Sequence, residues 1–215
     1  MAGTVALIDY GSGNLRSAEK ALARASHEGG SGHTIQVTDD PAIVARAERI
    51  VLPGVGAFAD CMAGLSKVPG MIAVLEESVR KRGTPFLGIC VGMQLMASVG
   101  REFGDTNGLG WIEGEVVKLT PSDPTLKIPH MGWNEIEGAQ GHPLLKGLGE
   151  KPNAYFVHSF VLHAARPSDV IATAQYGGAV TAAVARGNIA GTQFHPEKSQ
   201  AVGLKILRNF LGWAP

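Results

Sequence analysis

A cysteine stands between glycines at the end of an apolar run, in the stretch FLGICVGMQLM at residues 86–96. The segment around it, Gly88-Ile89-Cys90-Val91-Gly92, has the form of a strand-to-helix elbow, in which small flanking residues permit a tight turn that exposes a nucleophile. At a helix start, free N–H groups and the helix dipole favour the thiolate, and the amide of Val91 can help to bind an oxyanion. Free cysteine is also often buried, so the motif alone leaves a packing role open.

A histidine and a glutamate follow the last strand pattern, in the stretch GTQFHPEKS. The pattern ends at Phe194 and predicts that His195 and Glu197 point to the same side if the chain stays extended. His195 could then take a thiol proton, while Glu197 fixes the imidazole tautomer. Alone, such a pair is more often a surface feature. Together with the cysteine elbow, it favours nucleophilic catalysis by a Cys-His-Glu triad.

The stretch LPGVG, residues 52–56, also leads from a strand into a glycine-rich turn. Gly54 and Gly56 allow unusual backbone angles, so a peptide N–H here can face the site and complete an oxyanion hole. A simple strand-to-helix turn is the alternative.

The first half of the chain alternates short apolar runs with helical patterns. Helices are expected from about Asn14, over 57–65 and over 71–81, between the strand patterns TVALIDY, HTIQVT, RIVLPG and TPFLGI. This alternation predicts parallel βαβ units in a three-layer α/β structure. The segment SHEGGSGH, residues 26–33, predicts a flexible surface loop.

From Glu115 onward, strand patterns are separated by turn residues, before a last helix from about Ser199. The patterns are EVVKL, MGWNEIE, NAYFVHSFVL, VIATAQY, AVTAAVARG and IAGTQF. Antiparallel pairs are expected to extend the sheet and make it mixed. No repeat or linker is evident, so one domain over 1–215 is expected.

Composition excludes several classes of function. With 19 basic and 19 acidic residues, nothing indicates a nucleic-acid partner held by net charge. No stretch approaches the ~18 consecutive apolar residues of a membrane span, and Met1–Asp9 has no basic lead, so a cytoplasmic protein is expected. Cys61 and Cys90 are too few for a disulfide framework, which fits a reducing compartment.

The histidines show no spacing typical of a metal site. His130 and His158 are expected to be structural, and Cys61 is expected to pack in the core.

The motifs PGVG, LGICVGMQLM and FHPEKS together resemble class I, triad-type glutamine amidotransferases, and they occur in that family's order. Within it, IDYGSGNLRS at 8–17, PHMGWN at 129–134 and YFVHSF at 155–160 resemble the glutaminase subunits of imidazole glycerol phosphate synthase. Glutaminases of anthranilate synthase, carbamoyl phosphate synthetase and pyridoxal phosphate synthase share the triad. The resemblance implies a flavodoxin-like fold with a mostly parallel central sheet.

The resemblance implies hydrolysis of glutamine without a metal or organic cofactor. Cys90 would attack the amide, with His195 and Glu197 as its partners, and the oxyanion would lie against amides near Gly54, Val55 and Val91. The resemblance places the amino-acid end of the substrate against Gln94, Glu102, Ser159 and Phe160. Gln94 also lies one helical turn beyond Cys90, so the geometry supports it.

The resemblance further implies a heterodimer with a (β/α)₈-barrel cyclase subunit that receives the ammonia. Asn14, Trp133, Tyr155 and Lys198 would face this partner. From residue type alone, Trp133 and Tyr155 could equally be core residues, Asn14 a helix cap and Lys198 an ordinary solvated lysine.

Functions of another class stay open at this point. A cysteine hydrolase that acts without a partner, such as a peptidase, could use the same three residues. A scaffold without activity could bind a partner through the same fold. Glutamine turnover with and without a partner separates these possibilities.

Overall fold

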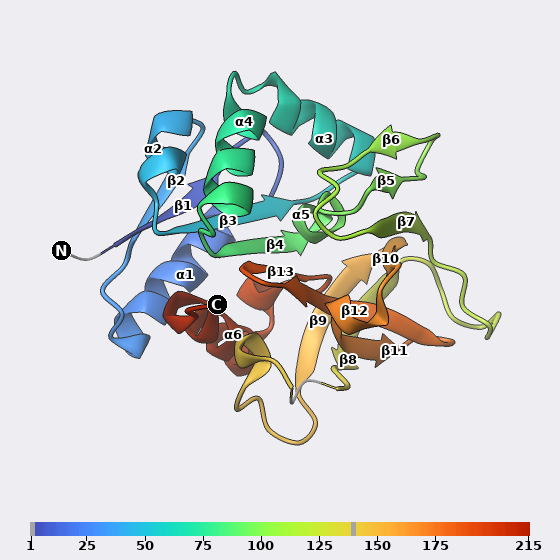
Figure 1. Ribbon diagram of the computed structural model, residues 1–215. Coiled ribbons are helices and arrows are strands. Elements are labelled where there is room, and N and C mark those ends of the chain that lie inside the picture. Colours follow the sequence, from blue (N-terminus) through green and yellow to red (C-terminus); the bar gives the residue numbers. More distant parts are fainter. Residues whose placement is uncertain (1–2, 139–140) are drawn as a thin grey trace.

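The computed structural model describes residues 3–138 and 141–215, and a mixed seven-stranded sheet forms its centre (Figure 1). In spatial order the sheet contains β11 (Val170–Gln175), β12 (Ala179–Arg186), β13 (Ile189–Thr192), β4 (Phe86–Cys90), β3 (Arg49–Gly54), β1 (Thr4–Ile8) and β2 (Thr34–Thr38). The strands from β13 to β2 pair in parallel; at one edge β12 pairs antiparallel with β13, and β11 pairs antiparallel with β12. The mostly parallel, mixed sheet expected from the sequence is confirmed.

The central strands are covered on both faces, which explains their continuous apolar runs. Ile50, Val51 and Leu52 of β3 are fully buried, as are Phe86 and Leu87 of β4.

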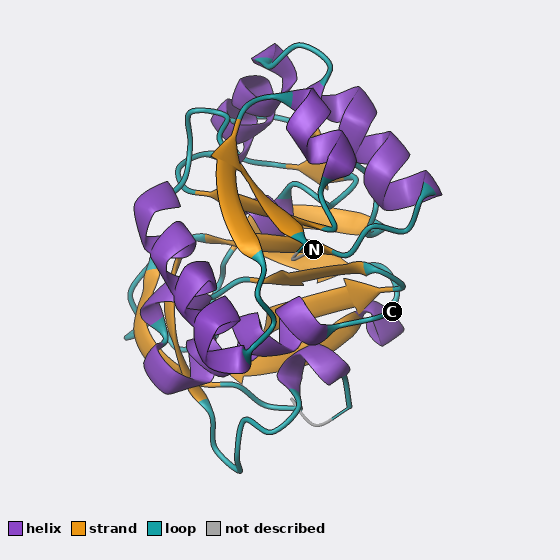
Figure 2. Cartoon of the chain, turned by 90° about the vertical axis from the view of Figure 1, so that its left-hand side faces the viewer, coloured by secondary structure: helices purple, strands orange, loops and turns teal. Residues whose placement is uncertain are grey.

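Helices lie on both sides of the sheet (Figures 1 and 2). One group contains α1 (Leu15–Gly29) and α6 (Gln200–Gly212), and the other contains α2 (Pro41–Arg46), α3 (Phe58–Lys67) and α4 (Met71–Leu75), which continues as the π-helical segment η1 (Glu76–Lys81). The short helix α5 (Val91–Gln94) follows β4 directly. The expected three layers are therefore present.

The second half of the chain also forms smaller sheets beside the central one. One has the order β10 (Phe160–Ala164), β7 (Gly114–Lys118), β5 (Val99–Gly100) and β6 (Thr106–Asn107). The other pairs β8 (His130–Glu135) with β9 (Asn153–His158). Single turns of 3-10 helix, η2 (Pro143–Leu145), η3 (Pro167–Asp169) and η4 (Pro196–Lys198), complete the structure.

The expectation that antiparallel pairs extend the central sheet is thus right for β11 and β12 only. The apolar pattern NAYFVHSFVL also forms β9 and β10 rather than one strand, with the break at Ser159. A strand pattern does not specify its partner, and these pairs form separate sheets over the cavity described below.

The loop expected at residues 26–33 is wrong over its first half, because α1 continues to Gly29. Ser26 is buried on this helix, where its hydroxyl donates to the carbonyl of His33 at 2.9 Å. Gly30 ends the helix in the left-handed conformation, with φ 67°. Gly30, one of the glycines that suggested a loop, therefore caps the helix.

The helix α2 was not expected, although the sequence carries its start signal. Asp40 accepts a hydrogen bond from the amide of Ala42 at 2.8 Å, and Pro41 occupies the first turn. A capping aspartate followed by proline is typical of a helix N-terminus.

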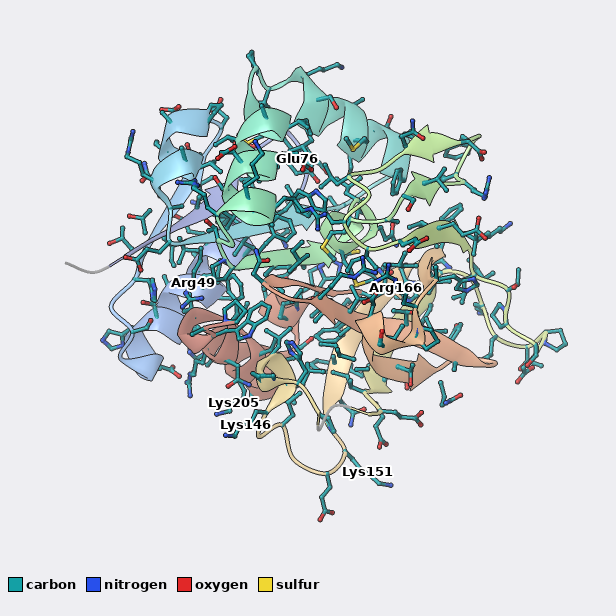
Figure 3. The ribbon with its side chains drawn as sticks, in the orientation of Figure 1. Arg49, Glu76, Lys146, Lys151, Arg166 and Lys205 are labelled. Carbon is teal, nitrogen blue, oxygen red and sulfur yellow. The ribbon has the colours of Figure 1, made fainter. Side chains whose placement is uncertain are left out.

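The end of the chain is fastened to the sheet through Arg49, at the start of β3 (Figure 3). Its guanidinium donates to the carbonyl of Trp213 at 2.7 Å and lies 5.8 Å from the ring centre of Phe210.

Among the described helices, none alone has the length and apolar character to cross a membrane. The helical segments Phe58–Lys67 and Met71–Lys81 together have the length and composition of a span, but they are bent by 94° relative to each other.

The turn between β4 and α5 depends on glycines that lie against backbone. A Cβ at Gly92 would lie 1.9 Å from the carbonyl oxygen of Leu52 on β3, and a Cβ at Gly88 would lie 2.5 Å from the carbonyl oxygen of Gly92. Backbone cannot move aside as a flexible side chain can. These contacts hold α5 directly against the ends of β3 and β4.

We expect Gly92→Ala to lower the free energy of unfolding by ~2–4 kcal/mol, because the added methyl group must displace the β3 backbone. Gly212→Ala is the matched control, since no atom lies within 4 Å of a Cβ built there. Urea unfolding should show the control unchanged or stabilised by ~0.4–1 kcal/mol. Equal stability of the two variants would contradict this account of the turn.

Candidate active site

The candidate site lies where parallel strands of the central sheet end at their carboxyl sides. Neighbouring strands β13, β4, β3 and β1 lead to His195, Cys90, Gly54 and Ser12 respectively. Such an edge is where open α/β sheets bind ligands. A cavity of about 310 Å³ opens here, lined by Val55, Gly56, Cys90, Val91, Gln94, Glu102, Pro129, Val157, His158, Ser159, Phe160, His195 and Lys198.

Cys90 occupies the turn expected from its motif. Its backbone has φ 55° and ψ −111°, a conformation that residues other than glycine rarely adopt, and the residue directly precedes α5. The residue is 4% exposed. The thiol therefore sits in a strained elbow at the wall of the cavity, as the motif predicts.

His195 and Glu197 come together, but not through the extended chain that the sequence suggested. β13 ends at Thr192, and η4 begins directly after His195. This turn brings His195 Nδ1 to 2.8 Å from Glu197 Oε1, with the side chains 2% and 3% exposed. Pro196 stands at the first position of η4, where its missing N–H is not needed.

The charge of His195 is set by its neighbours. Burial alone would lower its pKa, but the negative charges of Cys90 as a thiolate and of the Glu197 carboxylate raise the pKa to about 9. Its buried Nε2 has no hydrogen-bond partner among the described residues. The outer nitrogen of the imidazole is thus uncommitted within the part of the chain that the structure describes.

The backbone around His195 is anchored by residues that sequence reasoning missed. The amide of His195 donates to the carbonyl of Tyr155 at 3.0 Å. The hydroxyl of Ser199 donates to the carbonyl of His195 at 2.6 Å and accepts from the amide of Tyr155 at 2.9 Å. The motif letters FHPEKS include Ser199, but nothing in them predicted that it would join the histidine to β9.

The turn after β3 places Gly54 opposite Cys90 in the strand register. The N–H of Val55 is already in use, because it donates to Ser12 Oγ at 3.3 Å. The hydroxyl of Ser12 donates back to the carbonyl of Val55 at 2.6 Å, and the buried Cys61 thiol donates to the same carbonyl at 3.3 Å. Ser12 therefore holds the N–H that was expected to bind an oxyanion, and Ser12 and Cys61 together hold the carbonyl that follows it.

The residues expected at the amino-acid end of the substrate line the same cavity. Gln94 Nε2 donates to the carbonyl of Phe160 and to Gln193 Oε1, both at 3.0 Å. Because these contacts use both N–H groups of the amide, its carbonyl oxygen is the atom left for a ligand. Glu102 Oε2 accepts from the amide of Phe58 at 2.9 Å, at the first turn of α3, which leaves its other oxygen available.

Gln193 is a contact of the cysteine that the sequence reasoning did not identify. It is fully buried, and its Nε2 donates to the Cys90 sulfur at 3.7 Å. Its position two residues before His195 was the available signal, since it lies in the same motif.

Of the residues expected to face a partner, Lys198 lines the cavity, and Tyr155 and Trp133 follow beside it. Trp133 and Tyr155 are cross-strand neighbours in β8 and β9, with ring centres 6.1 Å apart, and Lys198 Nζ lies 5.7 Å from the Tyr155 ring centre. Trp133 is 50% exposed, so the core alternative is wrong for it. Asn14 precedes α1 without a side-chain capping hydrogen bond.

The histidines expected to be structural are buried beside the cavity. His130 Nδ1 and His158 Nε2 are 2.9 Å apart, and burial lowers the pKa of each ring to about 4. Within residues 3–138 and 141–215, no group of at least three His, Cys, Asp or Glu residues is arranged to hold a metal ion.

Comparison with known proteins gives consistent matches. Residues 6–213 match the family described as Glutamine amidotransferase class-I. The chain is 61% identical over 214 residues to the imidazole glycerol phosphate synthase subunit HisH of Agrobacterium fabrum, with 98% of this chain and 99% of the relative covered. It is 57% identical over 212 residues to the same subunit of Caulobacter vibrioides, with 99% of each covered.

Solved structures share the fold at low sequence identity. One glutamine amidotransferase matches with a TM-score of 0.72 and 18% identity, covering 98% of this chain and all of that one (100%). Another glutamine amidotransferase, from Thermotoga maritima, matches with a TM-score of 0.66 and 17% identity, covering 92% of this chain and 77% of that one.

We expect stability to fall in acid because of the buried histidine pair. The pKa of His130 is about 4 in the folded chain, against an ordinary value of 6.5, so below pH 6.5 the unfolded chain binds more protons. Stability present above pH 6.5 is therefore lost as the pH falls toward 4. Replacing His130 by Asn should make that loss smaller by up to ~3 kcal/mol, measured by urea unfolding across this range. The exposed His163 gives the control His163→Asn, and equal slopes for the two variants would refute the assignment.

Proposed function

The chain belongs to the class I glutamine amidotransferases and, among them, to the HisH glutaminase subunits of imidazole glycerol phosphate synthase, an enzyme of histidine biosynthesis, and on that premise we propose how its site works. We propose that Cys90, His195 and Glu197 hydrolyse the side-chain amide of glutamine to glutamate and ammonia. The observation that carries the proposal is that His195, paired with Glu197 at 2.8 Å, lines one cavity with the Cys90 elbow.

Before attack, the proton of Cys90 passes to His195, whose raised pKa favours the charged ring, and the resulting thiolate then attacks the amide carbon of glutamine. His195 then returns a proton to the nitrogen as the C–N bond breaks, so ammonia leaves and a thioester remains. Water then attacks the thioester while His195 takes a proton from the water. His195 passes this proton to the sulfur as the C–S bond breaks, and glutamate is released. These steps use only protein groups, glutamine and water.

Glu197 is proposed to orient the imidazole and to stabilise its charged form. Its hydrogen bond to Nδ1 leaves Nε2 for the thiol, and its carboxylate contributes to the raised pKa of His195.

The oxyanion is proposed to lie against amides near Gly54, Val55 and Val91. Val91 begins α5, where N–H groups point away from the helix. The N–H of Val55 donates to Ser12, so we propose that this is a resting arrangement and that the peptide turns toward the cavity for catalysis. Gly54 and Gly56 flank the peptide, and Gly56 already has φ 100°.

Glutamine is proposed to bind through its amino-acid end. The free oxygens of Gln94 and Glu102 are acceptors suited to the α-ammonium group. The backbone at Ser159 and Phe160, between β9 and β10, is proposed to hold the carboxylate. The position of all four residues on one cavity supports this arrangement.

The partner is proposed to be the (β/α)₈-barrel cyclase subunit of the synthase, in a heterodimer. It would receive ammonia to form imidazole glycerol phosphate and aminoimidazole carboxamide ribotide. The grouping of Trp133, Tyr155 and Lys198 near the cavity supports an interface there, and we place Asn14 in it as well. The match over residues 6–213 supports one domain over 1–215, and the unpaired thiols support a cytoplasmic location.

We expect Cys90→Ala to abolish glutamine hydrolysis and leave the fold intact, because a small residue suits the turn. In complex with the cyclase subunit, added ammonium salts should still support synthesis of imidazole glycerol phosphate. Ammonia release and product formation measure the two activities separately. Retained glutaminase activity in the pure variant would remove Cys90 from the mechanism and favour a different hydrolase site.

We expect the chain alone to be nearly inactive and the complex to turn over glutamine faster, mainly through kcat. A withheld oxyanion donor typically lowers kcat by ~10²–10³. Turnover should rise from the chain alone to the complex, and again with the cyclase's ribulosyl-aminoimidazole-carboxamide nucleotide bound. A rise confined to KM would mean that the partner completes the glutamine site instead.

The variant Ser12→Ala tests the same switch within the chain. It removes the hydroxyl that holds the N–H and the carbonyl of Val55. The glutaminase activity of the chain alone should therefore rise ~3–10-fold, in line with the loss of a hydrogen bond. Ser168→Ala, at an exposed position, is the control. An activity equal to or below that of the control would contradict the switch.

A further inference from the structure

Two buried histidines beside the cavity have no role in the chemistry proposed above. His130 is the first residue of β8 and His158 is the last residue of β9, and they face each other in the strand register. They are 2% and 5% exposed, and His158 lines the cavity. Buried polar atoms normally have hydrogen-bond partners, so each ring nitrogen of the pair should have one.

The direction of their hydrogen bonds follows from one carbonyl group. His158 Nδ1 lies 2.9 Å from the carbonyl oxygen of Phe160, which can only accept, so Nδ1 carries the hydrogen. In a neutral ring Nε2 is then an acceptor. It lies 2.9 Å from His130 Nδ1, which must therefore donate. By the same reasoning, Nε2 of His130 accepts, and Asn134 Nδ2 lies 3.2 Å from it.

The far end of this chain of hydrogen bonds is fixed by Asn134. Its Oδ1 accepts from the amide of Glu135 at 2.8 Å, and its Nδ2 also donates to the carbonyl of Gln175 at 2.9 Å. The amide therefore cannot turn over without losing both contacts. The hydrogen bonds run in one direction, from Asn134 through His130 and His158 to Phe160.

The rings are also held in place and kept neutral. The His130 ring stacks between Phe156 and Tyr176, with ring centres 4.7 and 4.0 Å away. Beside burial, His158 lowers the pKa of His130 and His195 lowers the pKa of His158. Burial and these neighbours disfavour a proton on either ring.

The near end reaches the glutamine site through the carbonyl of Phe160. That carbonyl also accepts from Gln94 Nε2 at 3.0 Å. Gln94 in turn donates to Gln193, whose Nε2 donates to the Cys90 sulfur. One backbone carbonyl thus joins the histidine pair to the side chain that we propose binds the substrate's ammonium group.

We propose that His130 and His158 are positioning residues for glutamine: together they fix the carbonyl of Phe160, and through it the Ser159–Phe160 backbone and the Gln94 amide. This inference rests on the proposed glutaminase activity. Neither ring touches the reacting atoms. Their loss should therefore act mainly on substrate binding, whereas loss of Cys90, His195 or Glu197 acts on the chemical step.

The kinetic test uses asparagine, whose amide nitrogen can replace the Nδ1–H of histidine, against leucine, which cannot donate. In complex with the cyclase subunit, His158→Leu should raise KM for glutamine ~10-fold and lower kcat by less than ~3-fold, consistent with a broken buried hydrogen bond. His158→Asn should restore KM to within ~3-fold of the parent. The pair His130→Leu and His130→Asn should behave in the same way, with a smaller rise.

The control is His163→Leu, an exposed histidine on β10, which should leave KM unchanged. A purely structural role would affect His158→Asn as severely as His158→Leu, and that result would overturn the proposal. So would an unchanged KM in both leucine variants.

A spectroscopic test needs no variant and no activity. In the parent chain labelled with ¹⁵N-histidine, NMR at neutral pH should show both rings as neutral Nδ1–H tautomers. Either ring as the Nε2–H tautomer, or a protonated ring, would overturn the proposal.

The two proposals can fail separately. Absence of glutamine turnover in the parent complex would refute the glutaminase proposal and leave the tautomers to be read. Normal turnover with the wrong tautomers would refute the positioning role alone.

Discussion

The parallel pairing of β13, β4, β3 and β1 is the constraint on which the site depends. Because these strands run side by side in one direction, their carboxyl ends meet at one edge, and each supplies one part of the site. His195, Cys90, Val55 and Ser12 are far apart in the sequence, yet they follow the spatial order of these strands. The small sheets then cover this edge, with β9 and β10 breaking at Ser159 to line the cavity.

The elbow at Cys90 shows how this constraint is met locally. A positive φ at a residue with a side chain costs about 1–3 kcal/mol, and it persists only where the surroundings enforce it. Here Gly92 lies against the β3 backbone and Gly88 against the carbonyl of Gly92, so that turn geometry and strand pairing fix each other. The strain places the sulfur at the wall of the cavity instead of within the sheet core.

The sequence predicted features that depend on neighbouring residues and missed those that depend on distant ones. The sequence could predict the elbow at Cys90 and the His195–Glu197 pair because each motif contains the residues that its geometry requires. Gln193 contacts Cys90 across 103 positions, and Ser12 contacts Val55 across 43, so no local pattern shows that these residues meet, although Gln193 lies in the same motif as His195. The loop predicted at residues 26–33 was wrong in part for a related reason. Glycines at a helix end resemble a flexible loop in the sequence, and only the structure shows that Ser26 is buried on the helix. The contact between His195 and Glu197 was likewise predicted for a partly wrong reason, since a 3-10 turn, not an extended strand, brings Glu197 to His195.

The groups proposed to take part in the reaction differ in whether their hydrogen bonds already suit catalysis. Glu197 already forms a hydrogen bond with Nδ1 of His195, and Nε2 of His195 has no partner among the described residues. The Phe160 carbonyl and the Gln94 amide are fixed by hydrogen bonds with defined directions. The peptide N–H of Val55, in contrast, is committed to Ser12. Control by a single peptide has a physical advantage over control by the triad, because turning one glycine-flanked peptide exchanges a few hydrogen bonds, whereas displacing His195 would break its contacts with Tyr155, Ser199 and Glu197 together. The peptide N–H of Val55, whose reorientation breaks the fewest contacts, is therefore the donor best suited to the proposed regulation.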